Sequence, residues 1–160
     1  MYDGHGGRQA SSFAARKLLD HIVALVDEIE AEALDGHAPD FSVAPQDVEG
    51  EDLRMLEAQE AVVSRLPVAL HRAFVQTDEE YNTKYQSSGT TATVALVCGW
   101  DLFVANVGDS CAYFDSGASV VLVSGNHRLD DNRAEQDRIV EQGGEIGQAM
   151  IENKTCGPLR

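Results

Sequence analysis

The chain has 160 residues, and 43% of them are hydrophobic, which is enough to bury one substantial core in a single domain. Twenty-seven acidic residues against twelve basic ones give a formal net charge of -15. Such a surface repels phosphate backbones and anionic lipid, which argues against nucleic acid and membranes as partners. The acidity is compatible with divalent cations, but a solvated acidic face explains it equally well.

The cysteines and the first residues bear on the cellular compartment. Cys98, Cys111 and Cys156 are widely spaced and form no CxxC pair, which favours reduced, structural thiols. The start MYDGHGG lacks the basic and apolar stretches of a signal peptide, and no window approaches the ~20 apolar residues that span a bilayer. We therefore expect a soluble intracellular protein, in the cytoplasm or the nucleus.

The first predicted element is an amphipathic helix that begins near Arg8 and ends between Leu34 and Gly36. Its apolar residues recur at helical spacing: Leu18, Ile22, Leu25 and Ile29. The residues from about 35 to 52 are polar and acidic and include two prolines, so we expect them to be exposed and mobile. We interpret the region of about 35 to 65 as a surface insertion in one domain that spans residues 1–160.

A second helical region follows the insertion. Residues 51–65 have a helical pattern, but Pro67 lacks an N–H and clashes with the preceding turn of a continuous helix. The sequence therefore predicts that a new helix begins at Pro67 and ends at the polar run Asn82-Thr83-Lys84. The expected apolar face of this helix carries Leu70, Ala73, Phe74 and Tyr81.

The pattern between Gly89 and Val123 is typical of β-strands. The apolar runs are TTATVALVC, LFVANV, CAYF and SVVLV, with short turn sequences between them. Short turns predict antiparallel hairpins. The segments TVALV and FVANV are too apolar for a sheet with one wet face, so we expect them to be buried between layers.

Beyond the strands, the pattern predicts a last helix, at about residues 131–142, that Gly143-Gly144 ends. Its modest apolar side consists of Ala134, Ile139 and Val140. We expect a final strand within the segment EIGQAMIEN. Helices, then a strand meander, then a helix and another strand indicate an α+β fold.

The segment YDGHGG, from Tyr2 to Gly7, places a carboxylate and an imidazole two residues apart among glycines. Glycine lets the backbone approach a ligand closely. Asp3 offers a hard oxygen ligand for Mg²⁺ or Mn²⁺, and His5 can donate a proton near neutral pH. Taken alone, such a segment is more often a simple strand-to-helix turn, because short motifs produce many false matches.

Two further segments combine hydroxyl groups with a carboxylate. Residues 88–92 (SGTTA) begin a predicted strand, and residues 104–110 (VANVGDS) end the next one. The ordinary interpretation is a strand start and a hairpin turn. The alternative is that Asp109 and the hydroxyls of the neighbouring strand face a metal ion and its waters.

The order of these segments is more specific than any one of them. DGHGG, a helical span, SGTTA, FVANVGDS, and then NHR before a helix that ends in RIVEQGG resemble the motif order of the PP2C (PPM) family of metal-dependent protein Ser/Thr phosphatases. The resemblance covers nearly the whole chain. It implies an α+β fold with a β-sandwich flanked by helices, incomplete here at both ends, and a two-metal site at one end of the sandwich.

The resemblance also implies roles for five residues. Asp3 matches the aspartate that bridges two metal ions, and Gly4 matches the glycine whose carbonyl binds one of them. His5 matches the histidine proposed as general acid. Asp109 matches an aspartate that helps to hold a third, weaker metal ion, and Thr91 matches a threonine near metal-bound water that is not itself a ligand.

A phosphatase of this type uses Mg²⁺ or Mn²⁺ as cofactor and phosphoproteins as substrates. The resemblance implies that a metal-bridging hydroxide hydrolyses phosphoserine or phosphothreonine, so that no protein nucleophile is needed.

Several features depart from the family pattern. The acidic ligand and phosphate-binding arginine that precede DGHGG in the family have no match here, and neither do two later metal-binding aspartates. We therefore expect this chain alone to lack appreciable phosphatase activity. The alternative interpretation is a truncated or non-catalytic module (a pseudophosphatase) that binds partners through the acidic insertion and the helices. Cys111 and Asn126 replace an arginine and an aspartate of the family, and we expect both changes to be tolerated.

The other histidines receive structural interpretations. His21, His37 and His71 have no neighbouring ligand at metal-binding spacing, and His127 is interpreted as a loop anchor.

Overall fold

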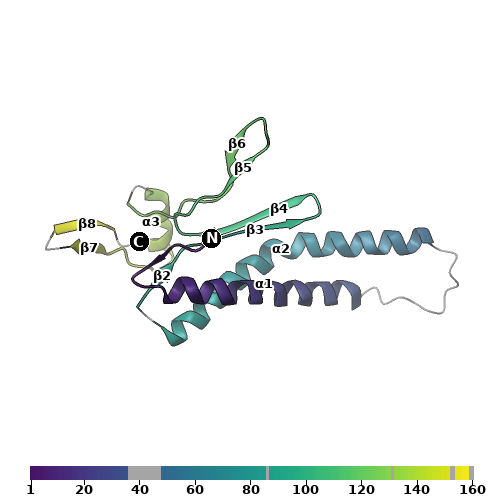
Figure 1. Ribbon diagram of the computed structural model, residues 1–160, viewed down its shortest axis with the longest axis horizontal. Helices are drawn as coiled ribbons and strands as arrows, with labels where there is room; N and C mark the ends of the chain where they lie inside the picture. The colour runs from purple at the N-terminus through teal and green to yellow at the C-terminus, as the bar shows by residue number, and fades with distance from the viewer. Residues whose placement is uncertain (36–47, 86, 131, 152–153, 159–160) are drawn as a thin grey trace.

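The structure, a computed structural model, describes residues 1–35, 48–85, 87–130, 132–151 and 154–158. Two long helices, α1 (Gln9–Asp35) and α2 (Val48–Lys84), lie side by side, and a β-hairpin packs along them (Figure 1). A third helix and small antiparallel sheets complete the described part, which confirms the predicted α+β class. Residues 36–47 of the predicted insertion lie outside the described residues, so its exposure and mobility stay predictions.

The predicted bounds of α1 are confirmed, and its apolar stripe forms the centre of the core. Leu18, Ile22 and Leu25 are buried, and Ile29 packs against them. From α2 the same cluster receives Ala69, Leu70 and Ala73. The helical spacing of these apolar residues puts them on facing sides of two antiparallel helices, so the helix pair is held mainly by apolar burial.

The prediction that a new helix begins at Pro67 is wrong, because α2 runs without interruption from Val48 to Lys84 with Pro67 inside it. Buried residues lie on both sides of the proline: Leu66 before it and Ala69 and Leu70 after it. Burial of these side chains offsets the hydrogen bond that a proline removes from a helix. The ribbon of α2 changes direction along its length, which is the usual response to an internal proline (Figure 1).

The longest strands form a hairpin of β3 (Ala92–Cys98) and β4 (Asp101–Val107), with Gly99 and Trp100 at the turn. Gly99 has a φ of 59°, which suits glycine. Alternate residues point to opposite faces of the hairpin. One face packs on the helices through Val94, Leu96, Phe103 and Ala105.

The expectation that both faces of these strands are buried between layers is wrong for the described part of the chain. On the face away from the helices, the Val97 side chain is 71% exposed and Leu102 is 41% exposed. The next hairpin, β5 (Tyr113–Asp115) with β6 (Val120–Leu122), projects away instead of covering this face (Figure 1). The strand residues are apolar enough for a two-layer position, but only one layer packs against them here.

Four short strands complete the fold. β1 (Gly4–His5) pairs with β2 (Gly89–Thr90), and β7 (Gln148–Ile151) pairs with β8 (Lys154–Pro158). All pairings among the described residues are antiparallel, and the β3–β4 and β5–β6 hairpins confirm what the short turns predicted. β7 lies within the segment EIGQAMIEN, which confirms a strand there, but it is not the final strand, because β8 follows it.

The last helix, α3 (Arg133–Glu141), forms close to its predicted position, but its apolar side is not buried. Ala134 and Val140 are exposed, whereas Glu135 is the buried residue. The Asn132 side chain caps the helix by accepting a hydrogen bond from the backbone N–H of Glu135. With few large apolar residues, α3 depends on capping and ion pairing more than on a core.

Among the described residues, Cys98 is a half-buried free thiol and Cys111 an exposed one, and the side chain of Cys156 lies outside the described part. Within the same residues, no helix has both the length and the apolar character needed to cross a membrane.

Neighbouring leucines of α1 give a matched test of this packing. Leu18 is 1% exposed in the core, whereas the next residue, Leu19, is 61% exposed to solvent. We expect Leu18→Ala to lower the free energy of unfolding by about 2–5 kcal/mol, because it leaves a cavity between the helices and the hairpin. Leu19→Ala should change it by less than about 0.5 kcal/mol. Urea denaturation measures both, and similar losses in the two variants would contradict this packing.

Candidate functional site

The first residues of the chain lie along the strands that follow α2. Gly4 pairs with Thr90 and His5 pairs with Gly89. Two further contacts extend this pairing: the backbone N–H of Thr91 donates to Asp3 O (2.9 Å), and that of Thr93 donates to Met1 O (3.0 Å). The DGHGG and SGTTA segments, which are far apart in the sequence, are thereby neighbours in space.

The Thr91 side chain connects three segments. Its Oγ1 accepts a hydrogen bond from the backbone N–H of Asp3 (3.1 Å) and lies 2.7 Å from Ser110 Oγ. A Cβ at Gly108 would come within 2.6 Å of Thr91 Cγ2, and Gly108 has a φ of 95°. Only glycine allows the GDS turn to approach Thr91 this closely. The turn therefore brings Asp109, which stands between Gly108 and Ser110, to the end of the β3–β4 hairpin that lies beside Asp3.

Ser88 anchors the other end of the DGHGG segment. The backbone N–H of Ala10, in the first turn of α1, donates to Ser88 Oγ (3.1 Å). Tyr81 of α2 makes a hydrogen bond of 2.7 Å with the same hydroxyl. Tyr81 is buried, and its ring lies 5.5 Å from that of Phe13. Ser88 therefore ties the start of β2 to both long helices.

Arg128 contacts the Asp109 carboxylate from the loop before α3. Its Nη1 lies 3.4 Å from Asp109 Oδ2, while its Nε and Nη2 lie 2.6 and 2.7 Å from the two carboxylate oxygens of Asp130. The bidentate pair with Asp130 is the stronger contact. The sequence interpretation did not identify Arg128, and no pattern in the sequence pairs it with Asp109.

The loop that carries Arg128 is fastened to the end of β4. The Asn106 side chain accepts from the backbone N–H of Gly125 (2.8 Å) and donates to Gly125 O (3.0 Å). The backbone N–H of His127 donates to Gly108 O (3.2 Å), which confirms the interpretation of His127 as a loop anchor. Asn106 was not singled out, although an amide inside the apolar run FVANV was a signal for such a contact.

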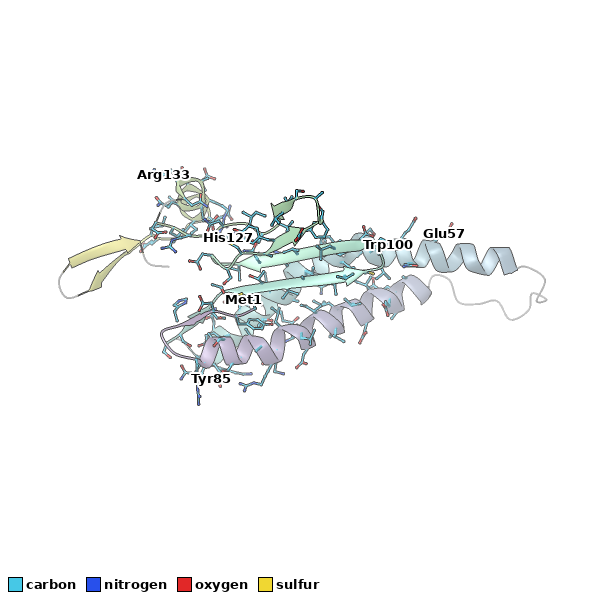
Figure 2. The ribbon with its side chains drawn as sticks, turned by 45° about the horizontal axis from the view of Figure 1, so that its top comes forward. Met1, Glu57, Tyr85, Trp100, His127 and Arg133 are labelled. Carbon is cyan, nitrogen blue, oxygen red and sulfur yellow. The ribbon has the colours of Figure 1, made fainter. Side chains whose placement is uncertain are left out.

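Asp3, Gly4 and His5 are exposed in the described structure. Figure 2 shows Met1 and His127 at one end of the β3–β4 hairpin and Trp100 at the opposite tip. The candidate site occupies the end marked by Met1 and His127. Beside it, burial raises the pKa of the Tyr2 phenol, which packs against the core.

The residues at this end are of the types that bind divalent cations, but fewer of them are gathered than such a site needs. The Asp3 carboxylate, the Gly4 carbonyl and the Asp109 carboxylate are hard oxygen donors, which Mg²⁺ and Mn²⁺ prefer. Within the described ranges, however, no group of three or more His, Cys, Asp or Glu side chains is arranged to hold a metal ion. The ligand roles of Asp3, Gly4 and Asp109 therefore stay predictions.

The other histidines lie away from this site. His21 Nδ1 is 2.8 Å from Thr77 Oγ1, and its Nε2 is 3.2 Å from Glu80 Oε2, so it links α1 to α2. His71 is exposed on α2, and His37 lies outside the described residues.

Comparison with known proteins decides the family. The family model described as "Protein phosphatase 2C" matches residues 1–160. The chain belongs to the protein phosphatase 2C family. It is 33% identical to "Probable protein phosphatase 2C 15" of Arabidopsis thaliana over its whole length, which covers 31% of that relative. It is 34% identical to "Probable protein phosphatase 2C 3" of Oryza sativa subsp. japonica, again over its whole length, which covers 28% of that relative.

The chain therefore spans about a third of the length of the curated PP2C relatives that it matches. The motif segments that carried the resemblance lie within this third, and three of them, DGHGG, SGTTA and VGDS, meet at Thr91.

Thr91 offers a test of how the site is held together. Its Oγ1 has two partners, and the residue is buried. Thr91→Val keeps the shape but leaves the Asp3 N–H and the Ser110 hydroxyl without this partner, so we expect the free energy of unfolding to fall by about 1–3 kcal/mol. Thr91→Ser retains the hydroxyl and should lose less. Chemical denaturation compares the variants, and equal stability of Thr91→Val and the unchanged protein would contradict this role.

Proposed function

We propose that this PP2C protein is a metal-dependent protein Ser/Thr phosphatase that hydrolyses phosphoserine and phosphothreonine in phosphoproteins. One observation supports this proposal. The exposed segment Asp3-Gly4-His5 meets Thr91 and the turn Gly108-Asp109-Ser110 at one end of the β3–β4 hairpin. Relatives that match the whole length of the chain are named probable protein phosphatases 2C.

In the proposed mechanism, Asp3 and Gly4 would provide oxygen ligands for Mg²⁺ or Mn²⁺, and Asp109 would contribute to a weaker cation site. Bound divalent cations supply an activated water and neutralise charge on the phosphoryl oxygens. Thr91 supports the ligands indirectly, because its hydroxyl holds the backbone of Asp3 in place. The chain's own contribution at this end is thus to hold carboxylate and carbonyl oxygens on a fixed backbone.

His5 is the proposed general acid. It stands directly after Gly4 on β1, and its side chain is exposed at the site. A seryl or threonyl oxygen is a poor leaving group, so a proton delivered as the P–O bond breaks lowers the barrier. An activated water would be the nucleophile, so the proposed mechanism needs no covalent part from Cys111 or the nearby serines.

The names of the relatives do not favour the alternative of a non-catalytic binding module.

The acidic surface of the chain is compatible with peptide substrates that carry basic residues near the phosphate, since such peptides are attracted by a net charge of -15.

Removal of the Asp3 carboxylate tests the proposed function. In the protein at its full natural length, with Mn²⁺, we expect Asp3→Asn to lower kcat/KM for a phosphoserine peptide by about 100-fold or more, since even residues that only support metal ligands cost 10–100-fold. Asp20→Asn is the matched control. Asp20 is exposed on α1 with a weak pair to Lys17, so this variant should keep its activity. Wild-type protein without Mn²⁺-dependent turnover, or Asp3→Asn with full turnover, would overturn the proposal.

The 160-residue chain alone should show no appreciable turnover of the same peptide. The reason is the ligand count: in the part of the chain that the structure describes, no three acidic, His or Cys side chains are gathered for a metal ion. A phosphate-release assay with Mn²⁺ measures this. Robust turnover that disappears in Asp3→Asn would contradict the prediction and would show that residues within this chain complete the site.

A further inference from the structure

The imidazole of His5 lies over a residue that has no side chain. His5 and Gly89 are directly opposite each other in the β1–β2 pair. A Cβ added at Gly89 would come within 2.6 Å of His5 Nε2 and 2.7 Å of His5 Cε1, whereas real Cβ atoms essentially never approach another heavy atom closer than 3.0 Å. The histidine ring therefore fills the space that any other residue at position 89 would need.

The backbone conformation does not explain the glycine at this position. Gly6 and Gly108 have φ values of 67° and 95°, in the region that favours glycine. Gly89 is not among the glycines with positive φ, so an alanine there would meet no backbone strain of this kind. What position 89 requires is the absence of a side chain beneath the His5 ring.

The strand beneath the ring is held more firmly than the ring itself. Ser88, next to Gly89, is tied to the first turn of α1 through Ala10 and to α2 through the buried Tyr81. His5 is exposed, and its ring borders a cavity of about 280 Å³ between β2 and the two helices. If a side chain is introduced at position 89, the ring can rotate at little cost, while the strand stays in place.

We propose that Gly89 is a positioning residue for His5, so that the bare backbone at this position sets where the imidazole delivers its proton. This inference rests on the proposed function, in which His5 protonates the leaving seryl or threonyl oxygen. Proton transfer requires the donor within hydrogen-bond reach of that oxygen, and a misplacement of about 1 Å can cost about 100-fold in rate. Gly89→Ala moves the His5 ring and leaves the fold and the oxygen ligands of Asp3 and Gly4 in place.

Two substrates separate lost proton donation from general damage. A phosphoserine peptide needs a proton on its leaving oxygen, whereas 4-nitrophenyl phosphate releases a stable phenolate without one. In the protein at its full natural length, we expect Gly89→Ala to lower kcat for the peptide by about 10- to 100-fold with KM unchanged, and to alter 4-nitrophenyl phosphate hydrolysis by less than about threefold. Equal losses on both substrates would overturn the proposal, because a folding or ligand defect affects both.

A double-mutant cycle tests whether Gly89 acts through His5. If it does, Gly89→Ala combined with His5→Ala hydrolyses the peptide as slowly as His5→Ala alone, because the ring that alanine displaces is already absent. If the two losses multiply, Gly89 acts by another route and the proposal is wrong. A Gly89→Ala protein that fails to fold would also overturn it, because the exposed ring is expected to yield.

NMR of the histidine rings provides a readout independent of activity, with a reciprocal control within the chain. A Cβ at Gly125 would lie 3.2 Å from His127 Cε1, so Gly125→Ala disturbs a different histidine. We expect Gly89→Ala to shift the imidazole signals of His5 and not those of His127, and Gly125→Ala to do the reverse. Unshifted His5 signals in Gly89→Ala refute the positioning role even if the protein is an active phosphatase. Wild-type protein that is inactive on the peptide refutes the proposed function first, and the proton-delivery role with it.

Discussion

The Thr91 hydroxyl is the contact on which the candidate site depends. It accepts the backbone N–H of Asp3, which is 88 residues away in the sequence, and pairs with the Ser110 hydroxyl, 19 residues away. Thr91 is buried, so these polar groups cannot exchange their partners for water without cost. The backbone contact between Thr91 N–H and Asp3 O adds a second link to the same segment. One residue thus sets the relative positions of the DGHGG, SGTTA and VGDS segments.

The helices supply the rigidity that this contact needs. Ser88 and Thr91 lie at the two ends of the short stretch that faces the DGHGG segment, and Ser88 is bound to both α1 and α2. The helix pair is itself held by the burial of Leu18, Ile22 and Leu70. A site made from a turn and two strand ends is therefore supported by a packed helical layer, which keeps short segments from moving independently.

The electrostatics of the site differ between its two carboxylates. Asp109 lies beside the Arg128 guanidinium, whose stronger contact is with Asp130, whereas Asp3 is an exposed carboxylate on the opposite segment. A cation that approaches Asp109 competes with a positive charge already there, so that carboxylate is the weaker candidate ligand. The loop of Arg128 is stabilised at its far end by α3, where a hydrogen bond from Arg138 lowers the pKa of Glu135.

Several features of the fold followed from local pattern alone. The helical spacing of Leu18, Ile22 and Leu25 gave the position of α1, and the turn residues Gly99 and Trp100 stand between two strands as predicted. The apolar character of Val97 misled the interpretation of burial, because hydropathy says how much a side chain gains from burial and not whether a second layer is present. The prediction of a helix start at Pro67 was wrong as well. Burial of side chains before and after the proline keeps the helix continuous, although proline removes a hydrogen bond.

For the candidate site, the sequence by itself determined which residue types are available: Asp3, Gly4 and His5 among glycines, and Asp109 in a turn after an apolar strand. The order of these motifs was enough to indicate the family. Only the tertiary structure decided that Thr91 joins the segments, that Arg128 pairs with Asp109, and that the His5 ring lies over Gly89. These contacts join residues that are 19 to 88 positions apart, so no local periodicity in the sequence encodes them. They form because burial of the helices and the hairpin brings distant backbone segments within hydrogen-bond reach.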